Sequence, residues 1–280
     1  MPHSPSPSPS STSSSSPLLD RRIERLRAEA EAEPRLTGVL LYGSWTVGEA
    51  DAHSDIEAYL YVRDDAADTF DGAGFLARIA PLELAYTNLY GVLAVVFDDL
   101  MRGEFHIAPA GPGIAEIADW HGAVHLPRPD RAVLLDRTGA LTRAAHRLTD
   151  CPPPDPAPTA QRLTDELANW TLMFAEVQSR GETARAHALL HTVVAPHQLQ
   201  LLRLLRGSTA HWLTPSRALE SDLPPADAAR YTTTSRAHGP ELRAAGRASW
   251  RWSRELSAEA AARWGIRVPS ALYDGIDRLL

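Results

Sequence analysis

Two acidic side chains, two residues apart, stand at the start of the segment DIEAYLYV, residues 55–62. The alternation of polar and apolar residues predicts a β-strand, which points Asp55 and Glu57 to one face, about 6–7 Å apart at the backbone. Two carboxylates that close repel each other, and a divalent cation such as Mg²⁺ relieves the repulsion. The pair is therefore a candidate metal site, although a lone Asp-x-Glu on an amphipathic strand is more often a solvated face.

A Gly-Ser turn precedes this strand. The apolar run LTGVLLY, residues 36–42, predicts a buried strand that stops at Gly43-Ser44. Glycine lets the backbone approach a ligand closely, and backbone N–H groups together with the Ser44 hydroxyl can hold phosphate oxygens. A lone Gly-Ser indicates only a turn, but the order strand, turn, Asp-x-Glu strand predicts adjacent phosphate and metal sites. Tyr42 and Trp45 flank the turn and could stack on a base, although such aromatic residues more often belong to the core.

A third carboxylate, Glu104, lies in LMRGEFHIA, residues 100–108, where alternation puts Glu104 and His106 on one face of a strand. In phosphoryl transfer to a hydroxyl, Glu104 could complete the metal site or accept the proton of the acceptor. Its alternative is a surface salt bridge with Arg102. Arg102 could itself hold a phosphate, or pair with Asp98 or Asp99. His106 could line an acceptor pocket or remain a polar surface residue.

The composition narrows the class of protein. The chain has 280 residues and is 44% hydrophobic, which is ordinary for a globular protein. Its formal net charge of −7 disfavours a nucleic-acid partner, because binding that polyanion needs a basic surface. The sequence contains no lysine, so arginine and backbone N–H groups must neutralise any phosphate. The single cysteine, Cys151, and the lack of a long apolar run favour a cytoplasmic protein that does not span a membrane.

The sequence predicts an α+β chain of two domains. Residues 1–17 are a Ser/Pro-rich tail that we expect to be disordered. Residues 18–150 carry the signals of a mixed β-sheet domain with helices, and residues 151–159, CPPPDPAPT, those of a proline-rich linker. Residues 160–280 show helical periodicity and predict an all-α bundle of about five helices.

The first of these domains should hold several elements besides the two strands around the turn. We expect helices over residues 18–33, 70–79 and 137–148, and strands over residues 82–87, 91–97 and 104–108.

Longer stretches resemble a known family. YGSWTVGEADAHSDIE, IAPLELAYTNLYGVLAVVFDDLMRGEFHI and NWTLMFAEVQSRGETARAHALLHTVVAPHQLQLLRLL are similar to the lincosamide nucleotidyltransferases of the two-domain, dimeric type, within the nucleotidyltransferase superfamily. The resemblance runs from about Leu36 to near the C-terminus. It implies a nucleotidyltransferase domain followed by a helical domain that helps to bind the acceptor and to dimerise.

The resemblance also implies the chemistry. The family transfers AMP from ATP, with Mg²⁺, to a hydroxyl of lincomycin or clindamycin and so inactivates the antibiotic. It implies that Asp55, Glu57 and Glu104 are the catalytic and metal-binding residues. It places Gly43 and Ser44 at the triphosphate, where Arg102 could join them.

Two other functions remain open from the sequence. One is the same transfer to another small hydroxylated acceptor, such as an aminoglycoside or a natural product. The other is an antitoxin-type or regulatory protein with a nucleotidyltransferase fold, although such proteins are usually single short domains.

Overall fold

A computed structural model describes residues 16–120, 124–150, 152–235, 240–268 and 270–280. The chain forms two compact units, Met1–Cys151 and Pro152–Leu280, and each is described here by itself. Most of the expected N-terminal tail, and Cys151 in the expected linker, lie outside the described residues. Both boundaries shift by a few residues, because Pro17 is the first residue of helix α1 and Pro156 the first of helix α7. Proline fits the first turn of a helix, where its missing N–H is not needed.

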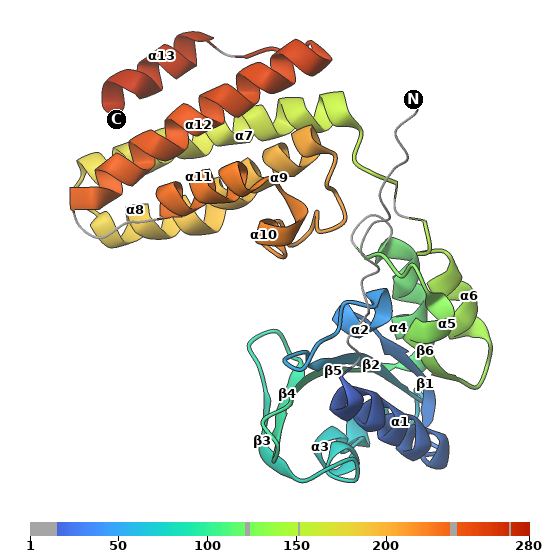
Figure 1. Ribbon diagram of the computed structural model, residues 1–280. Helices are drawn as coiled ribbons and strands as arrows, with labels where there is room; N and C mark the ends of the chain where they lie inside the picture. Colours follow the sequence, from blue (N-terminus) through green and yellow to red (C-terminus); the bar gives the residue numbers. More distant parts are fainter. Residues whose placement is uncertain (1–15, 121–123, 151, 236–239, 269) are drawn as a thin grey trace, which may run out of the picture. The chain divides into compact units, whose positions relative to one another are not determined.

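A six-stranded sheet forms the first unit, with the strand order β3-β4-β5-β2-β1-β6 (Figure 1). Its strands are β1 (Leu36–Leu41), β2 (Ile56–Val62), β3 (Leu82–Thr87), β4 (Leu93–Phe97), β5 (Arg102–Pro109) and β6 (Val133–Asp136). Strands β2 and β5 are parallel, and the other neighbours are antiparallel. The sheet is therefore mixed, as the sequence predicts.

Helices cover the two faces of the sheet unequally. The helices of this unit are α1 (Pro17–Ala32), α2 (Ser44–Val47), α3 (Gly72–Leu76), α4 (Ala110–Glu116), α5 (Pro129–Ala132) and α6 (Ala140–His146). On one face, α1 and α3 bury side chains such as Leu26 and Phe75 against Ala58 and Phe105. On the other face, a second core joins Tyr61 of β2 to Ile117, and to Leu141 of α6. In Figure 1 the β3–β4 hairpin lies at the end of the sheet away from α4, α5 and α6.

Two expected helices of this unit are shorter than the sequence indicates. In the expected helix 70–79, Asp71 caps α3 by accepting a hydrogen bond from the Gly74 N–H at 2.9 Å, so the helix begins at Gly72. In the expected helix 137–148, Asp136 accepts from the Gly139 N–H at 2.8 Å, and α6 begins at Ala140. In both places a carboxylate stops the preceding chain in a turn.

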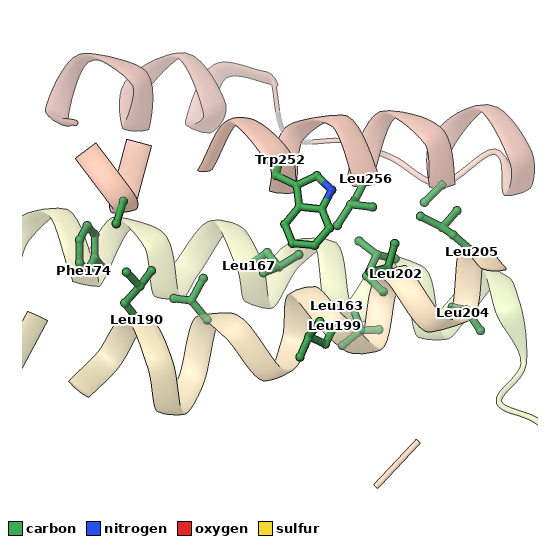
Figure 2. Close-up of a cluster of buried hydrophobic side chains, with 14 of the residues drawn as sticks. Leu163, Leu167, Phe174, Leu190, Leu199, Leu202, Leu204, Leu205, Trp252 and Leu256 are labelled. Atoms are coloured by element: carbon green, nitrogen blue, oxygen red, sulfur yellow. The ribbon is translucent and has the colours of Figure 1, made fainter. Parts of the chain in front are cut away.

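Helices alone make up the second unit. They are α7 (Pro156–Ser179), α8 (Thr183–Leu189), a π-helical turn (Leu190–Val194), α9 (Ala195–Arg206), α10 (Leu219–Asp222), α11 (Pro225–Ser235), α12 (Pro240–Trp264) and α13 (Ser270–Leu279). Leucines of α7 and α9 pack around Trp252 of α12, as Figure 2 shows. The described residues thus hold seven α-helices where the sequence predicts about five.

A buried arginine holds the connection between α9 and α11. The side chain of Arg203 is fully buried. It donates to the carbonyl oxygen of Pro215 at 2.7 Å and pairs with Asp222 at 2.8 Å. His211 also contacts Asp222, at 2.6 Å.

Among the described helices, none is both long and apolar enough to cross a membrane.

Candidate active site

The parallel pairing of β2 with β5 brings the three candidate carboxylates together. Glu57 lies directly opposite Glu104 in the register. Neighbouring strands are about 4.8 Å apart, so these two side chains leave the sheet side by side. Asp55 is the residue just before β2 and is linked to β5 through Arg102. The predicted trio thus converges from two strands on one face of the sheet.

The Gly-Ser turn touches this trio. The N–H of Tyr42 donates to the carbonyl oxygen of Glu57 at 3.0 Å, so the β1–β2 ladder continues up to the turn. Gly43 follows with φ 74°, a conformation that glycine adopts without strain. A Cβ at this position would lie 1.6 Å from Oε2 of Glu57. Glycine is therefore required here both by the backbone and by the carboxylate beside it.

Short hydrogen bonds hold the chain between the turn and Asp55. Thr46 donates its hydroxyl to the carbonyl oxygen of Gly43 at 2.8 Å. Further along, the Asp51 N–H donates to Oγ of Ser54 at 2.9 Å, and the His53 N–H donates to Oδ1 of Asp51 at 2.8 Å. These bonds fix both ends of a connection that is otherwise turn-rich, and so they position Ser44 and Asp55.

Arg102 lies among the carboxylates. Its guanidinium is 3.7 Å from Oδ2 of Asp55 and 3.4 Å from Oε1 of Glu104. Of the other partners that the sequence offers for Arg102, Asp98 and Asp99, the second pairs with Arg22 at 2.6 Å. The alternative salt bridge between Glu104 and Arg102 is present, and it lies inside the site. The side chain of Arg102 is 63% exposed, so a phosphate could reach it.

Aromatic rings continue the same face beyond the carboxylates. His106 stacks on Tyr59 with ring centroids 4.2 Å apart, and its Nε2 lies 3.2 Å from the Tyr42 hydroxyl. Trp120 contacts the other side of the group, 4.8 Å from Tyr59. His106 is thus half-buried in an aromatic cluster. It is neither a fully exposed surface residue nor the wall of a closed pocket.

The pKa values of Tyr42 and His106 are shifted by burial and by the nearby carboxylates. Burial raises the pKa of Tyr42, and the negative charges of Glu57, Glu104 and Asp55 raise it further. Burial lowers the pKa of His106, against the opposing charge of Glu104. Both rings are therefore neutral at pH 7, and the carboxylates make the potential around them negative.

Trp45 packs beside the Gly43-Ser44 turn and holds it in place. Its indole N–H donates to Oδ1 of Asp20 in α1 at 2.9 Å. The guanidinium of Arg131 lies 4.1 Å from the centre of its ring. Trp45 therefore ties α2 to its neighbours, as the core interpretation of this residue predicts, and Tyr42 likewise packs in the core of the second face.

Sequence reasoning missed two arginines beside the turn. Arg128 is exposed, and its guanidinium nitrogens lie 3.4 and 3.6 Å from where a Cβ on Gly48 would be, at the end of α2. Arg131 is on the next helical turn, and its Nε is buried without a hydrogen-bond partner among the described residues. The only available signal was general, since a chain without lysine must use arginine at a phosphate site.

The donor set of the site suits a hard divalent cation. Three carboxylates offer oxygen ligands of the kind that Mg²⁺ prefers. Among the described residues, no group of three acidic, histidine or cysteine side chains is already drawn together as a metal-binding cluster. Arg102 instead supplies positive charge to two of the carboxylates. A hollow of about 270 Å³ opens beside Asp55 and Arg102 and leaves room for ligand groups.

Comparisons with known proteins were made for the whole chain. Residues 157–278 match the family described as "Lincosamide nucleotidyltransferase-like, C-terminal domain". A search of the curated proteins finds no significant match.

Two solved structures are similar in chain trace. The aminoglycoside 6-adenyltransferase from Bacillus subtilis has 14% identity and a TM-score of 0.41, over 92% of this chain and 96% of that chain. The nucleotidyltransferase-like protein from Exiguobacterium sibiricum 255-15 has 13% identity and a TM-score of 0.37, over 87% and 77%. At these scores neither structure adds to the argument.

The family match covers 122 of the 280 residues and lies within the second unit. The second unit is thus similar to the C-terminal domain of the lincosamide nucleotidyltransferase-like proteins, as the resemblance in the sequence predicts.

Proposed function

We propose that this protein transfers AMP from ATP to a hydroxyl of a small-molecule antibiotic, a lincosamide such as lincomycin or clindamycin, and so inactivates it. The observation that carries the proposal is the contact between the Gly43 turn and Glu57, opposite Glu104. The turn that would bind phosphate therefore lies directly beside a carboxylate that would bind the metal. The family of the second unit supports a lincosamide as the acceptor.

The reaction joins two substrates in line. The acceptor oxygen attacks the α-phosphorus, a new P–O bond forms, the bond to the β-phosphate breaks, and pyrophosphate leaves. Glu104 takes the proton of the acceptor hydroxyl, and Asp55 with Glu57 would hold Mg²⁺. When bound there, Mg²⁺ would supply positive charge that stabilises the charge developing on the transferred phosphate.

The remaining residues position the triphosphate. The N–H groups of Gly43 and Ser44 meet its oxygens, as nest-like turns do. Arg102, beside Asp55 and Glu104, and Arg128, beside Gly48, supply the positive charge that lysine would supply elsewhere. His106 is neutral and hydrogen-bonded to Tyr42, so it shapes the site without adding charge.

The test is direct. The protein is incubated with ATP, Mg²⁺ and each member of an acceptor panel of lincosamides and aminoglycosides, and each acceptor is weighed by mass spectrometry. We expect lincomycin to gain the mass of one AMP group, and Asp55→Asn to abolish that gain. An aminoglycoside modified in its place would overturn the lincosamide assignment, and no modified acceptor would overturn the transfer itself.

The second unit is proposed to help bind the acceptor and to mediate a homodimer in the cytoplasm. Light scattering on the purified protein tests the dimer, with twice the mass of the 280-residue chain as the expected result. A monomer at micromolar concentration would contradict it.

A further inference from the structure

The face that carries the carboxylates continues across two more strands. Glu104 lies opposite Ala94 of β4, and Ala94 lies opposite Tyr86 of β3. One step along the strands, Arg102 lies opposite Val96, and Val96 lies opposite Leu84. Directly paired residues project to the same face of a sheet. Two parallel rows therefore lead from the site to the edge strand.

This part of the face is open and apolar. Tyr86 is 51% exposed and Leu84 is 49% exposed. Ala94 lies between these two residues and the carboxylates. Its side chain is small and buried, whereas the larger side chains of Leu84 and Tyr86 project from the edge strand. On the reverse face, Val95 of β4 and Phe105 of β5 are buried in the core under α1 and α3, whereas Ala85 of the edge strand β3 is exposed there as well. Large apolar side chains left side by side on a surface often mark a binding site.

The other directions along the face are already taken. On the β1 side of Glu57, the turn at Gly43 fills the space and is assigned to the triphosphate. Further along β2 and β5, Tyr59 and His106 pack under Trp120. A molecule whose hydroxyl meets Glu104 can therefore extend toward β4 and β3, into the hollow beside Asp55 and Arg102, or outward from the sheet.

We propose that the strip formed by Leu84, Tyr86, Ala94 and Val96 is the surface on which the acceptor lies, and this rests on the proposed function. The occupant is a small amphipathic molecule that carries at least one hydroxyl. Its hydroxyl points to Glu104, and its apolar part lies over Ala94 against the ring of Tyr86. Two strand spacings separate Glu104 from Tyr86, or about 10 Å, which is the length of a drug-sized molecule.

The β3–β4 hairpin offers a matched control. Tyr90 and Leu89, at its tip, are 90% and 101% exposed but lie beyond the paired strands. Tyr86→Ser and Tyr90→Ser thus remove the same ring from the same hairpin, on and off the strip. We expect Tyr86→Ser to raise the KM of the acceptor about tenfold and to leave the KM of ATP unchanged, since stacking on one aromatic ring contributes about one factor of ten. Tyr90→Ser should change neither constant.

Each outcome decides the proposal. Equal acceptor KM values for the two variants, with transfer intact, would overturn the strip and leave the proposed function standing. A change of oligomeric state or a loss of thermal stability in Tyr86→Ser alone would also overturn it, because the ring would then be a contact within the protein. Absence of transfer in the unaltered protein would overturn both proposals. A selective rise in acceptor KM, repeated by Leu84→Ser and not by Leu89→Ser, supports the strip.

Discussion

In the first unit, Asp55, Glu57 and Glu104 converge on one face of the sheet, and Arg102 approaches two of them. In the second unit, the fully buried Arg203 meets Asp222 at close range and is further bonded to backbone carbonyl oxygens. The first arrangement gathers like charges near the surface, and the second pairs opposite charges in the interior.

The two arrangements of charge serve different purposes, ligand binding in the first unit and stability in the second. Carboxylates that gather on one face repel one another in part, since Arg102 offsets the charge of Asp55 and Glu104, and they are explained by a ligand that they bind. A buried arginine with a full set of partners holds its own loop together, and losing one partner is costly. The two kinds of charge should therefore respond in opposite ways to neutralising substitutions.

The largest effect is expected from Glu57→Gln. Transfer should fall by about two to four orders of magnitude, because a ligand or base carboxylate is removed. The thermal midpoint should stay the same or rise, because repulsion with Asp55 and Glu104 is relieved. Steady-state kinetics and calorimetry measure the two quantities. Glu83→Gln, on the exposed bulge of β3, is the control and should keep full activity; an active Glu57→Gln would refute the site.

The reverse pattern is expected from Arg203→Leu. It leaves Asp222 and several carbonyl oxygens without their donor, and should lower the free energy of unfolding by about 3 kcal/mol. Urea unfolding measures the change. Arg185→Leu removes an exposed pair with Glu182 and should cost less than about 0.5 kcal/mol. Similar losses of unfolding free energy in the two variants would show that burial of an ion pair does not increase its contribution to stability.

A smaller effect is expected from Arg128→Ala. If this guanidinium meets the triphosphate, the KM of ATP should rise about tenfold, since a charge-assisted hydrogen bond contributes roughly one factor of ten. Unfolding should be unaffected, because Arg128 is exposed. Arg147→Ala, an exposed arginine after α6, is the control. An unchanged KM in both variants would remove Arg128 from the site.

A last prediction concerns the pH dependence of a paired carboxylate within the first unit. The hydrogen bond from Arg35 lowers the pKa of Glu33 from its usual 4.5 to about 2. A lowered pKa means that ionised Glu33 stabilises the fold above pH 4.5, and that this contribution is lost as the pH falls toward 2. Glu33→Gln should therefore be less stable at pH 7 and lose less stability between pH 4.5 and 2. Unfolding curves across that window give the answer, and parallel pH profiles would contradict it.

Alternation and turn chemistry predicted most of the first unit. They located strands β1 to β5 and the turn at Gly43, but not the short edge strand β6. They could not predict that β2 pairs with β5, since that pairing depends on chain segments far apart, nor therefore that Glu57 lies opposite Glu104. For the same reason Arg128 and Tyr86 escaped notice, because nothing in their local sequence distinguishes them from other exposed residues.

The second unit was harder to divide. Helical periodicity showed that it is all-helical, but short helices such as α10 are too brief to leave a periodic signal. Arg203 looked like any arginine on a polar helix face. Its burial depends on the loop that folds back over α9, which no local pattern reveals.

The parallel pairing of β2 with β5 also has a consequence for how the protein folds. Strands β1 and β2 are close in the chain and can pair early, whereas β5 must return across a long crossover to lie beside β2. Closing that long loop is slow compared with local pairing. The carboxylate trio therefore comes into being only when the slow step is complete. During refolding, recovery of transfer should lag behind recovery of helix and of the β1–β2 ladder, which makes activity a reporter of the finished sheet.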